Sequence, residues 1–256
     1  MQLQSGAAFT TTKLVRWSGS VNDSFDIYVS VPPSYDSGQK YSVVYYLDAN
    51  LPSGSALQFL LSTKGYDHQF SNVLFVGIGH RYKGNHNVPR KRDFMMPALP
   101  GDTRTNRNSH AERFYLFVKN ELVPYVNRSY PVINNSSAII GHSLGGLFVF
   151  YCLFKNENLF SHFFAIGPAL WVHRYAIYNY DRLADDQTHN KYLFLSAGSK
   201  EVFNRILHGA NKAKKYFDLR KYPKLKYDYV VVKGKGHHSQ VPVTLAIILD
   251  RKLSAF

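Results

Sequence analysis

Cysteine is almost absent from this chain, since Cys152 is the only one among its 256 residues. A single cysteine cannot form an internal disulfide, so a disulfide-stabilised scaffold is excluded. Because Cys152 lies in an apolar stretch, we expect a buried thiol without a chemical role. Long hydrophobic runs are missing too, and no stretch approaches the roughly 20 apolar residues that a transmembrane helix needs. The sequence therefore predicts no membrane span.

Acidic residues are scarce, with 17 Asp and Glu against 31 Lys and Arg, which gives a formal net charge of +14. Such an excess can indicate a nucleic-acid partner. However, the basic residues are dispersed, and zinc-finger spacing, a ribonucleoprotein aromatic signature and a basic heptad helix are all missing. We therefore expect no nucleic-acid partner and interpret most of the charge as a solvated basic surface.

Metal, cofactor and targeting motifs are also missing. There is no H-E-x-x-H, no phosphate loop, and Gly77-Ile78-Gly79 lacks the third glycine of a dinucleotide fingerprint. We expect neither a metal nor an organic cofactor. Residues 1–12 lack the charged start and apolar block of a secretory signal. A cytoplasmic location is the default expectation, and a periplasmic or secreted one follows if a signal peptide has been removed.

What the sequence does contain is a regular alternation of apolar runs and helical patterns. This alternation predicts an α/β fold with right-handed crossovers, in which helices cover both faces of a mostly parallel central sheet. The length suits one domain, and no linker or repeat interrupts it, so we expect a single domain over residues 1–256. The strands are expected at residues 25–31 (near the sheet edge), 43–47, 73–79, 138–140, 163–166, 192–195 and 227–232. The clearest helices are expected from a capping box at Ser109 and Glu112, over 147–154 and over 243–253.

The most informative motif is Gly141-His142-Ser143-Leu144-Gly145, which stands between an expected strand and an expected helix. A strand, a sharp turn and a helix are the context of a nucleophile elbow, and the flanking glycines remove side chains that would collide in the turn. Ser143 is therefore the candidate nucleophile.

A serine hydroxyl needs a neighbouring base, and two histidines follow the last expected strand in Gly236-His237-His238-Ser239. In this architecture the order along the chain is serine, acid, histidine, so either His237 or His238 can be the base. Glu201 is the best-placed acid, because it follows the strand expected at 192–195. It can equally be an exposed residue at a helix N-terminus, and a Ser–His dyad without an acid is the alternative.

An oxyanion hole needs two backbone N–H groups aimed at the charge that develops on the carbonyl oxygen. Leu144, directly after the nucleophile, is expected to supply one. The second is expected from the loop that follows the strand at 43–47, where we choose Asn50.

Further motifs accompany these residues: Val31-Pro32-Pro33-Ser34-Tyr35, Tyr45-Tyr46-Leu47-Asp48, Gly77-Ile78-Gly79, Arg92-Asp93-Phe94, Glu121-Leu122-Val123-Pro124-Tyr125 and Gly167-Pro168-Ala169-Leu170-Trp171. With them, the chain resembles the putative esterase family of α/β-hydrolases, which includes enterochelin esterases and esterase D-like proteins, from about Asp26 to Leu249. The resemblance implies an α/β-hydrolase fold and cleavage of carboxylic esters through an acyl-enzyme intermediate, without metal or cofactor. It favours His237 as the base and agrees with Glu201 as the acid.

Members of that family act on siderophore trilactones, on acyl groups of polysaccharides or on small thioesters, so the resemblance implies a small-molecule or carbohydrate ester substrate. We hypothesise an anionic one, such as a catecholate siderophore or an acidic sugar ester, contacted by Arg92, with Trp171 as an apolar or stacking wall. The alternative is a catalytically silent α/β-hydrolase-fold protein that binds a carbohydrate or an anionic ligand. The hypothesis rests on the basic segment 82–108 and its flank, which carry Arg81, Lys83, Arg90, Lys91, Arg92, Arg104 and Arg107.

Overall fold

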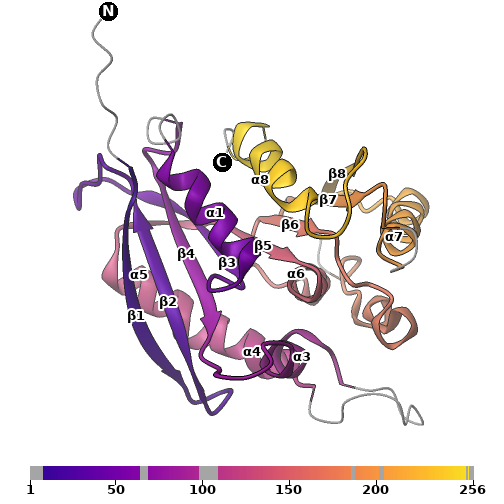
Figure 1. The fold of residues 1–256 in the computed structure, drawn as a ribbon, viewed down its shortest axis with the longest axis horizontal. Helices are drawn as coiled ribbons and strands as arrows, with labels where there is room; N and C mark the ends of the chain where they lie inside the picture. Colours follow the sequence, from indigo (N-terminus) through magenta and orange to yellow (C-terminus); the bar gives the residue numbers. More distant parts are fainter. Residues whose placement is uncertain are drawn as a thin grey trace, which may run out of the picture.

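A single mixed sheet forms the centre of the computed structural model, which describes residues 8–63, 69–97, 109–185, 188–201, 205–251 and 253 (Figure 1). Within these residues the strand order is β1-β2-β4-β3-β5-β6-β7-β8. Pairing is antiparallel from β1 to β2 and from β2 to β4, and parallel from β4 through to β8. The mostly parallel sheet is thus confirmed. The strands are β1 (Thr10–Ser18), β2 (Asp23–Val31), β3 (Tyr41–Leu47), β4 (Val73–His80), β5 (Val132–His142), β6 (His162–Ile166), β7 (Lys191–Gly198) and β8 (Leu225–Val232).

Strand β1 has no counterpart among the strands expected from the sequence. It pairs along its whole length with β2 and forms the edge of the sheet. Strand β2, expected near the edge, is therefore the second strand of the sheet. Most side chains of β1 are exposed or half-buried, including Val15 and Trp17. Only Leu14 of this strand packs against the core and Ser18 is buried, so β1 lacks the apolar alternation by which strands are recognised.

Helices cover both faces of the sheet. On one face α1 and α8 pack against each other, and the remaining helices of the described part lie on the other face (Figure 1). None of them is long and apolar enough to span a bilayer in the part of the chain that is described. The helices are α1 (Pro52–Ser62), α3 (Asn87–Phe94), α4 (Ala111–Leu116), the π-helical η1 (Phe117–Leu122), α5 (Val123–Ser129), α6 (Leu144–Lys155), the 3-10 helix η2 (Val172–Tyr180), α7 (Ile206–Arg220) and α8 (Gln240–Arg251).

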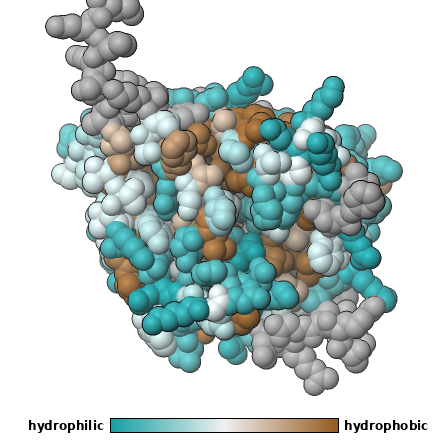
Figure 2. Space-filling view, viewed as in Figure 1, coloured by the Kyte–Doolittle hydropathy of each residue, from teal (hydrophilic) through white to brown (hydrophobic). Residues whose placement is uncertain are grey.

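The buried strand β3 shows how the sequence builds these two layers. Val43, Tyr45 and Leu47 join the core beneath α6, whereas Val44 and Tyr46 join the core beneath α1 and α8. Successive side chains of a strand point to opposite faces, so an uninterrupted apolar run is what a strand covered on both faces requires. On the outside, hydrophobic residues form separate areas among hydrophilic ones on the face drawn in Figure 2.

The expected capping box at Ser109 and Glu112 is wrong. Helix α4 begins one residue later, with His110 at the N-cap and no side-chain cap, and the Ser109 side chain is fully buried. The Glu112 carboxylate instead accepts hydrogen bonds from the Tyr151 hydroxyl and from Lys155 Nζ, both on α6. A tertiary partner that carries a positive charge competes successfully with a local backbone N–H for this carboxylate.

The chain reverses its direction of growth across the sheet at β3, which lies between β4 and β5. In open α/β sheets such a switch point leaves a crevice at the carboxyl ends of the adjacent strands. Residues that follow β3 and β5 therefore meet at one place.

Candidate active site

Ser143 occupies a sharp turn between β5 and α6. Its backbone has φ of 61° and ψ of −115°, a left-handed conformation that costs a non-glycine residue about 1–3 kcal/mol. A Cβ atom at Gly141 would lie 2.3 Å from the carbonyl oxygen of Gly145, so only glycine allows this approach. The turn is held because the Ser143 N–H donates to the Ile166 carbonyl oxygen of β6 at 3.0 Å. The side chain is thereby presented at the carboxyl end of the sheet.

His237 reaches this serine from the loop after β8. Its Nε2 lies 2.9 Å from Ser143 Oγ, and its Nδ1 is hydrogen-bonded to Glu201 Oε1. The His237 side chain is 21% exposed and that of Glu201 is fully buried, so the pair opens to solvent only at the histidine. The structure thus brings together the three residues expected from the sequence. The histidine contacts the serine through one ring nitrogen and the acid through the other, as in a catalytic triad. Two other acidic side chains of this part of the chain, Asp218 and Asp228, accept hydrogen bonds from the hydroxyls of Tyr227 and Tyr192.

The carboxylate of Glu201 is fixed by two further donors. The Gly198 N–H donates to Glu201 Oε2 at 2.5 Å, and Gln240 Nε2 donates to the same atom at 2.6 Å. Gln240 is fully buried and accepts a hydrogen bond at its Oε1 from the Ser196 hydroxyl at 3.3 Å. Sequence reasoning missed Gln240, because a lone glutamine in the first turn of a helix has no distinguishing pattern.

Close contact between two loops brings the acid to the histidine. The Lys200 N–H donates to the Lys235 carbonyl oxygen at 2.9 Å, and the Gly234 N–H donates to Ser199 Oγ at 2.8 Å. A Cβ atom at Gly198 would lie 2.4 Å from the Lys235 carbonyl oxygen. Glycine at position 198 is therefore needed for the loops after β7 and β8 to touch.

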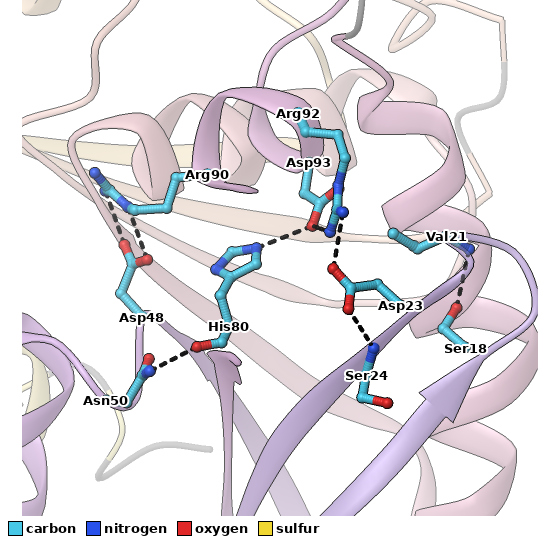
Figure 3. Close-up of polar contacts among 10 residues, drawn as sticks. All are labelled: Ser18, Val21, Asp23, Ser24, Asp48, Asn50, His80, Arg90, Arg92 and Asp93. Carbon is cyan, nitrogen blue, oxygen red and sulfur yellow. Dashed lines mark hydrogen bonds and ion pairs between the residues drawn. The ribbon is translucent and has the colours of Figure 1, made fainter. Parts of the chain in front are cut away.

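The two expected oxyanion donors lie on either side of the switch point. Leu144 begins α6, and Asn50 follows β3. Among the described residues neither backbone N–H has a hydrogen-bond acceptor, whereas the neighbouring Ala49 N–H donates to the Ile78 carbonyl oxygen. The Asn50 side chain is anchored, since its Nδ2 donates to the His80 carbonyl oxygen at 2.8 Å (Figure 3). Both amides are thus available to a ligand, and their role as oxyanion donors stays a prediction.

His142, directly before the nucleophile, lies under the catalytic loop. Its Nε2 is 3.0 Å from the His237 carbonyl oxygen, which requires the tautomer that carries a hydrogen on Nε2. Burial and the adjacent His237 imidazole hold the pKa of His142 well below its usual range. His142 is therefore a neutral donor that supports the backbone of His237.

This arrangement predicts a pH-dependent stability. Below about pH 6.5 the unfolded chain gains a proton at His142 that the folded protein does not take up, so the free energy of unfolding should fall by up to about 1.4 kcal/mol per pH unit. His142→Gln keeps a donor but removes the titration, so its free energy of unfolding, measured with urea between pH 7 and pH 5, should fall less steeply. The exposed His86→Gln is the control and should keep the wild-type slope. Equal slopes for both variants would show that His142 titrates normally.

Arg92, expected to contact substrate, is engaged by carboxylates. Its Nε lies 2.7 Å from Asp93 and its Nη1 lies 2.8 Å from Asp23, while Asp93 also meets His80 at 3.0 Å (Figure 3). Burial acts to raise the pKa of Asp93, but hydrogen bonds from Arg92 and His80 hold it below its usual range. The arginine therefore neutralises a buried acid, and this arrangement does not favour the substrate contact. Arg104 and Arg107 of the same basic segment lie outside the described residues.

Trp171 remains available as a wall of the site. It is 39% exposed and follows Ala169, whose N–H donates to the Ser143 carbonyl oxygen at 2.9 Å. The side chain thus belongs to a segment tied to the elbow, and its contact with substrate stays a prediction.

Comparison with known proteins gives a family and several relatives. A family model described as "Putative esterase" matches residues 18–242. The chain is 26% identical over 245 residues to the ferri-bacillibactin esterase BesA of Bacillus subtilis, covering 90% of this chain and 84% of that protein. It is 24% identical over 187 residues to a siderophore enterobactin esterase of Emericella nidulans, covering 66% of this chain and 61% of that protein. Among solved structures, the BES protein from Bacillus cereus superposes with a TM-score of 0.81 at 24% identity, over 97% of this chain and 98% of that one, which confirms the expected fold.

Proposed function

The chain belongs to the Putative esterase family, and on that premise we propose that it is a serine esterase that hydrolyses the ester bonds of a siderophore. The observation that carries the proposal is the hydrogen bond of 2.9 Å between Ser143 Oγ and His237 Nε2, with Glu201 bonded to the other ring nitrogen. We also propose that residues 1–256 form one domain, since both cores pack against the same sheet.

The arrangement supports a two-step acyl transfer. Ser143 Oγ attacks the ester carbonyl carbon while its proton passes to His237 Nε2, and the oxyanion accepts hydrogen bonds from the N–H groups of Leu144 and Asn50. Collapse of the intermediate breaks the bond to the leaving alkoxide, which takes the proton from His237. Water then attacks the acyl carbonyl carbon while His237 takes its proton. Collapse of this second intermediate breaks the bond to Ser143 Oγ, which takes the proton from His237, and the carboxylic acid is released. Glu201 keeps the imidazole oriented and stabilises its charged form in both steps.

Two features support an anionic substrate such as a siderophore. Two relatives of this chain are named as siderophore esterases. In addition, Lys200 and Lys235, which immediately flank the acid and histidine loops, have no carboxylate partner in the described part of the chain, in contrast to Arg92. Unpaired cations at the rim of a site attract anionic ligands and raise their encounter rate.

The proposal is tested by incubating the protein with ferric and iron-free bacillibactin and enterobactin and with acetylated oligosaccharides, and by following the products by mass spectrometry. We expect hydrolysis of a siderophore with a kcat/KM of about 10,000 per molar per second or more, and much slower cleavage of the sugar esters. Preference for the sugar esters would reject the siderophore as substrate but would still support an esterase activity. Absence of any turnover, together with failure of a fluorophosphonate probe to label Ser143, would favour the silent binding protein.

A further inference from the structure

A buried ion pair outside the triad links the two segments that carry the oxyanion donors. Arg90 on α3 binds Asp48 through two parallel contacts, Nε to Oδ1 at 2.8 Å and Nη2 to Oδ2 at 2.9 Å (Figure 3). Asp48 is 1% exposed, and the side chain of Arg90 is 11% exposed. A bidentate pair of this kind fixes the relative orientation of its partners as well as their distance.

Asp48 stands where β3 passes into the loop that presents Asn50. It adopts φ of 56°, which is unusual for a residue with a side chain. Its carboxylate lies against the start of α6, because a Cβ atom at Gly145 would be only 3.3 Å from Asp48 Oδ2. Arg90 Nη2 also lies 3.4 Å from the carbonyl oxygen of His142, the residue before the nucleophile. The guanidinium therefore touches both sides of the switch point.

The two N–H groups expected to bind the oxyanion belong to these two sides, Leu144 to the elbow and Asn50 to the loop after β3. On its far side, the loop is held by the hydrogen bond from Asn50 Nδ2 to the His80 carbonyl oxygen. The Ala49 N–H also donates to the Ile78 carbonyl oxygen, and Gln58 Nε2 donates to the Ala49 carbonyl oxygen at 3.1 Å. Toward the nucleophile elbow, the contacts of the loop are those of Asp48. An oxyanion hole works only if its donors are placed before the charge develops, and a displacement of about 1 Å can cost about 100-fold in rate.

We propose that Arg90 is a positioning residue that sets the separation of the two oxyanion donors by clamping Asp48 against the nucleophile elbow. The proposal rests on the esterase function proposed above. A direct contact between Arg90 and an anionic substrate fits the geometry poorly, because two of its three guanidinium nitrogens already face the Asp48 carboxylate and its side chain is mostly buried.

The test compares Arg90→Gln and Arg90→Lys with Lys91→Gln, an exposed neighbour on the same helix that loses the same charge. On a neutral ester such as p-nitrophenyl acetate, Arg90→Gln should lower kcat about 10- to 100-fold with KM changed less than about 3-fold. Arg90→Lys should fall between it and the wild type, since lysine keeps the charge but not the two parallel hydrogen bonds. Lys91→Gln should behave as the wild type.

Loss of Arg90 leaves a buried carboxylate unpaired, so the double variant Asp48→Asn with Arg90→Gln is measured as well. It removes both charges, and if the pair acts as a unit its kcat should lie within about 3-fold of the Arg90→Gln value. Hydrogen exchange supplies a reading that does not depend on catalysis: the amides of residues 48–51 should exchange faster in the double variant than in Lys91→Gln.

Unchanged kcat in both the single and the double variant, or unchanged exchange in residues 48–51, would overturn the positioning role. A loss confined to anionic esters would overturn it in favour of a substrate contact. Failure of the proposed function is seen separately, because the wild type itself would then neither cleave the ester nor react with a fluorophosphonate at Ser143.

Discussion

Replacing Ser143 with alanine is expected to lower kcat for p-nitrophenyl acetate by about 10,000- to 1,000,000-fold, since the acyl-enzyme of the proposed mechanism forms on its hydroxyl. The hydroxyl lies 2.9 Å from the only imidazole placed to take its proton among the described residues. A residual rate above that in water is expected, because the oxyanion donors and the binding surface remain. The measurement is the initial rate at saturating ester.

The control for this change is Ser62→Ala, an exposed serine at the end of α1 whose hydroxyl donates to the Phe59 carbonyl oxygen of its own helix. It should keep wild-type kcat. A fluorophosphonate should label the wild type and Ser62→Ala but not Ser143→Ala. Stoichiometric labelling of Ser143→Ala, or turnover near the wild-type value, would place the nucleophile on another residue. The melting temperature of Ser143→Ala should stay close to that of the wild type, because alanine at φ of 61° is strained to a similar degree as serine.

The fold could be predicted where the local sequence pattern is enough to identify an element. The apolar runs of β3 and β4 are buried on both faces, so their pattern alone identified them. Strand β1 could not be found in this way, because most of its side chains are exposed or half-buried and its pairing with β2 makes it a strand. The capping box failed for a different reason, since the carboxylate of Glu112 bonds to Tyr151 of α6, 39 residues further along the chain, and not to a local backbone N–H.

In the candidate site, too, some residues could be predicted from the sequence and others could not. Ser143, His237 and Glu201 each follow a strand and belong to short glycine-containing motifs, so their convergence could be expected from topology before any distance was known. The residues that hold the site in place could not. Arg90 and Asp48 are 42 positions apart in the sequence, and Gln240 and Glu201 are 39 apart. Neither Arg90 nor Gln240 belongs to a sequence pattern from which its partner could be predicted. Arg92 was chosen because it lies in a basic segment that follows a strand end; it pairs with Asp93 and Asp23, and its contact with substrate stays a prediction.

Replacing His237 with alanine should lower kcat about as much as Ser143→Ala does, by about 10,000-fold or more, because nucleophile and base act as one unit. The double variant of Ser143 and His237 should then be no slower than either single variant. His238→Ala is the matched control: the ring of His238 lies edge-on to that of His237, with the centroids 5.1 Å apart, but makes no hydrogen bond to Ser143 in the described structure. Its kcat should remain within about 10-fold of the wild type.

Comparing His237→Ala with His238→Ala shows which of the two adjacent histidines is the base. If His237 is the base, His238→Ala keeps most of the wild-type kcat, whereas His237→Ala loses it. The contacts favour this outcome, because Glu201, itself held by Gly198 and Gln240, bonds to the Nδ1 of His237 alone among the described histidines. A His238→Ala variant that loses activity as completely as His237→Ala, while its melting temperature is unchanged, would mean that the loop rearranges in solution to exchange the two rings.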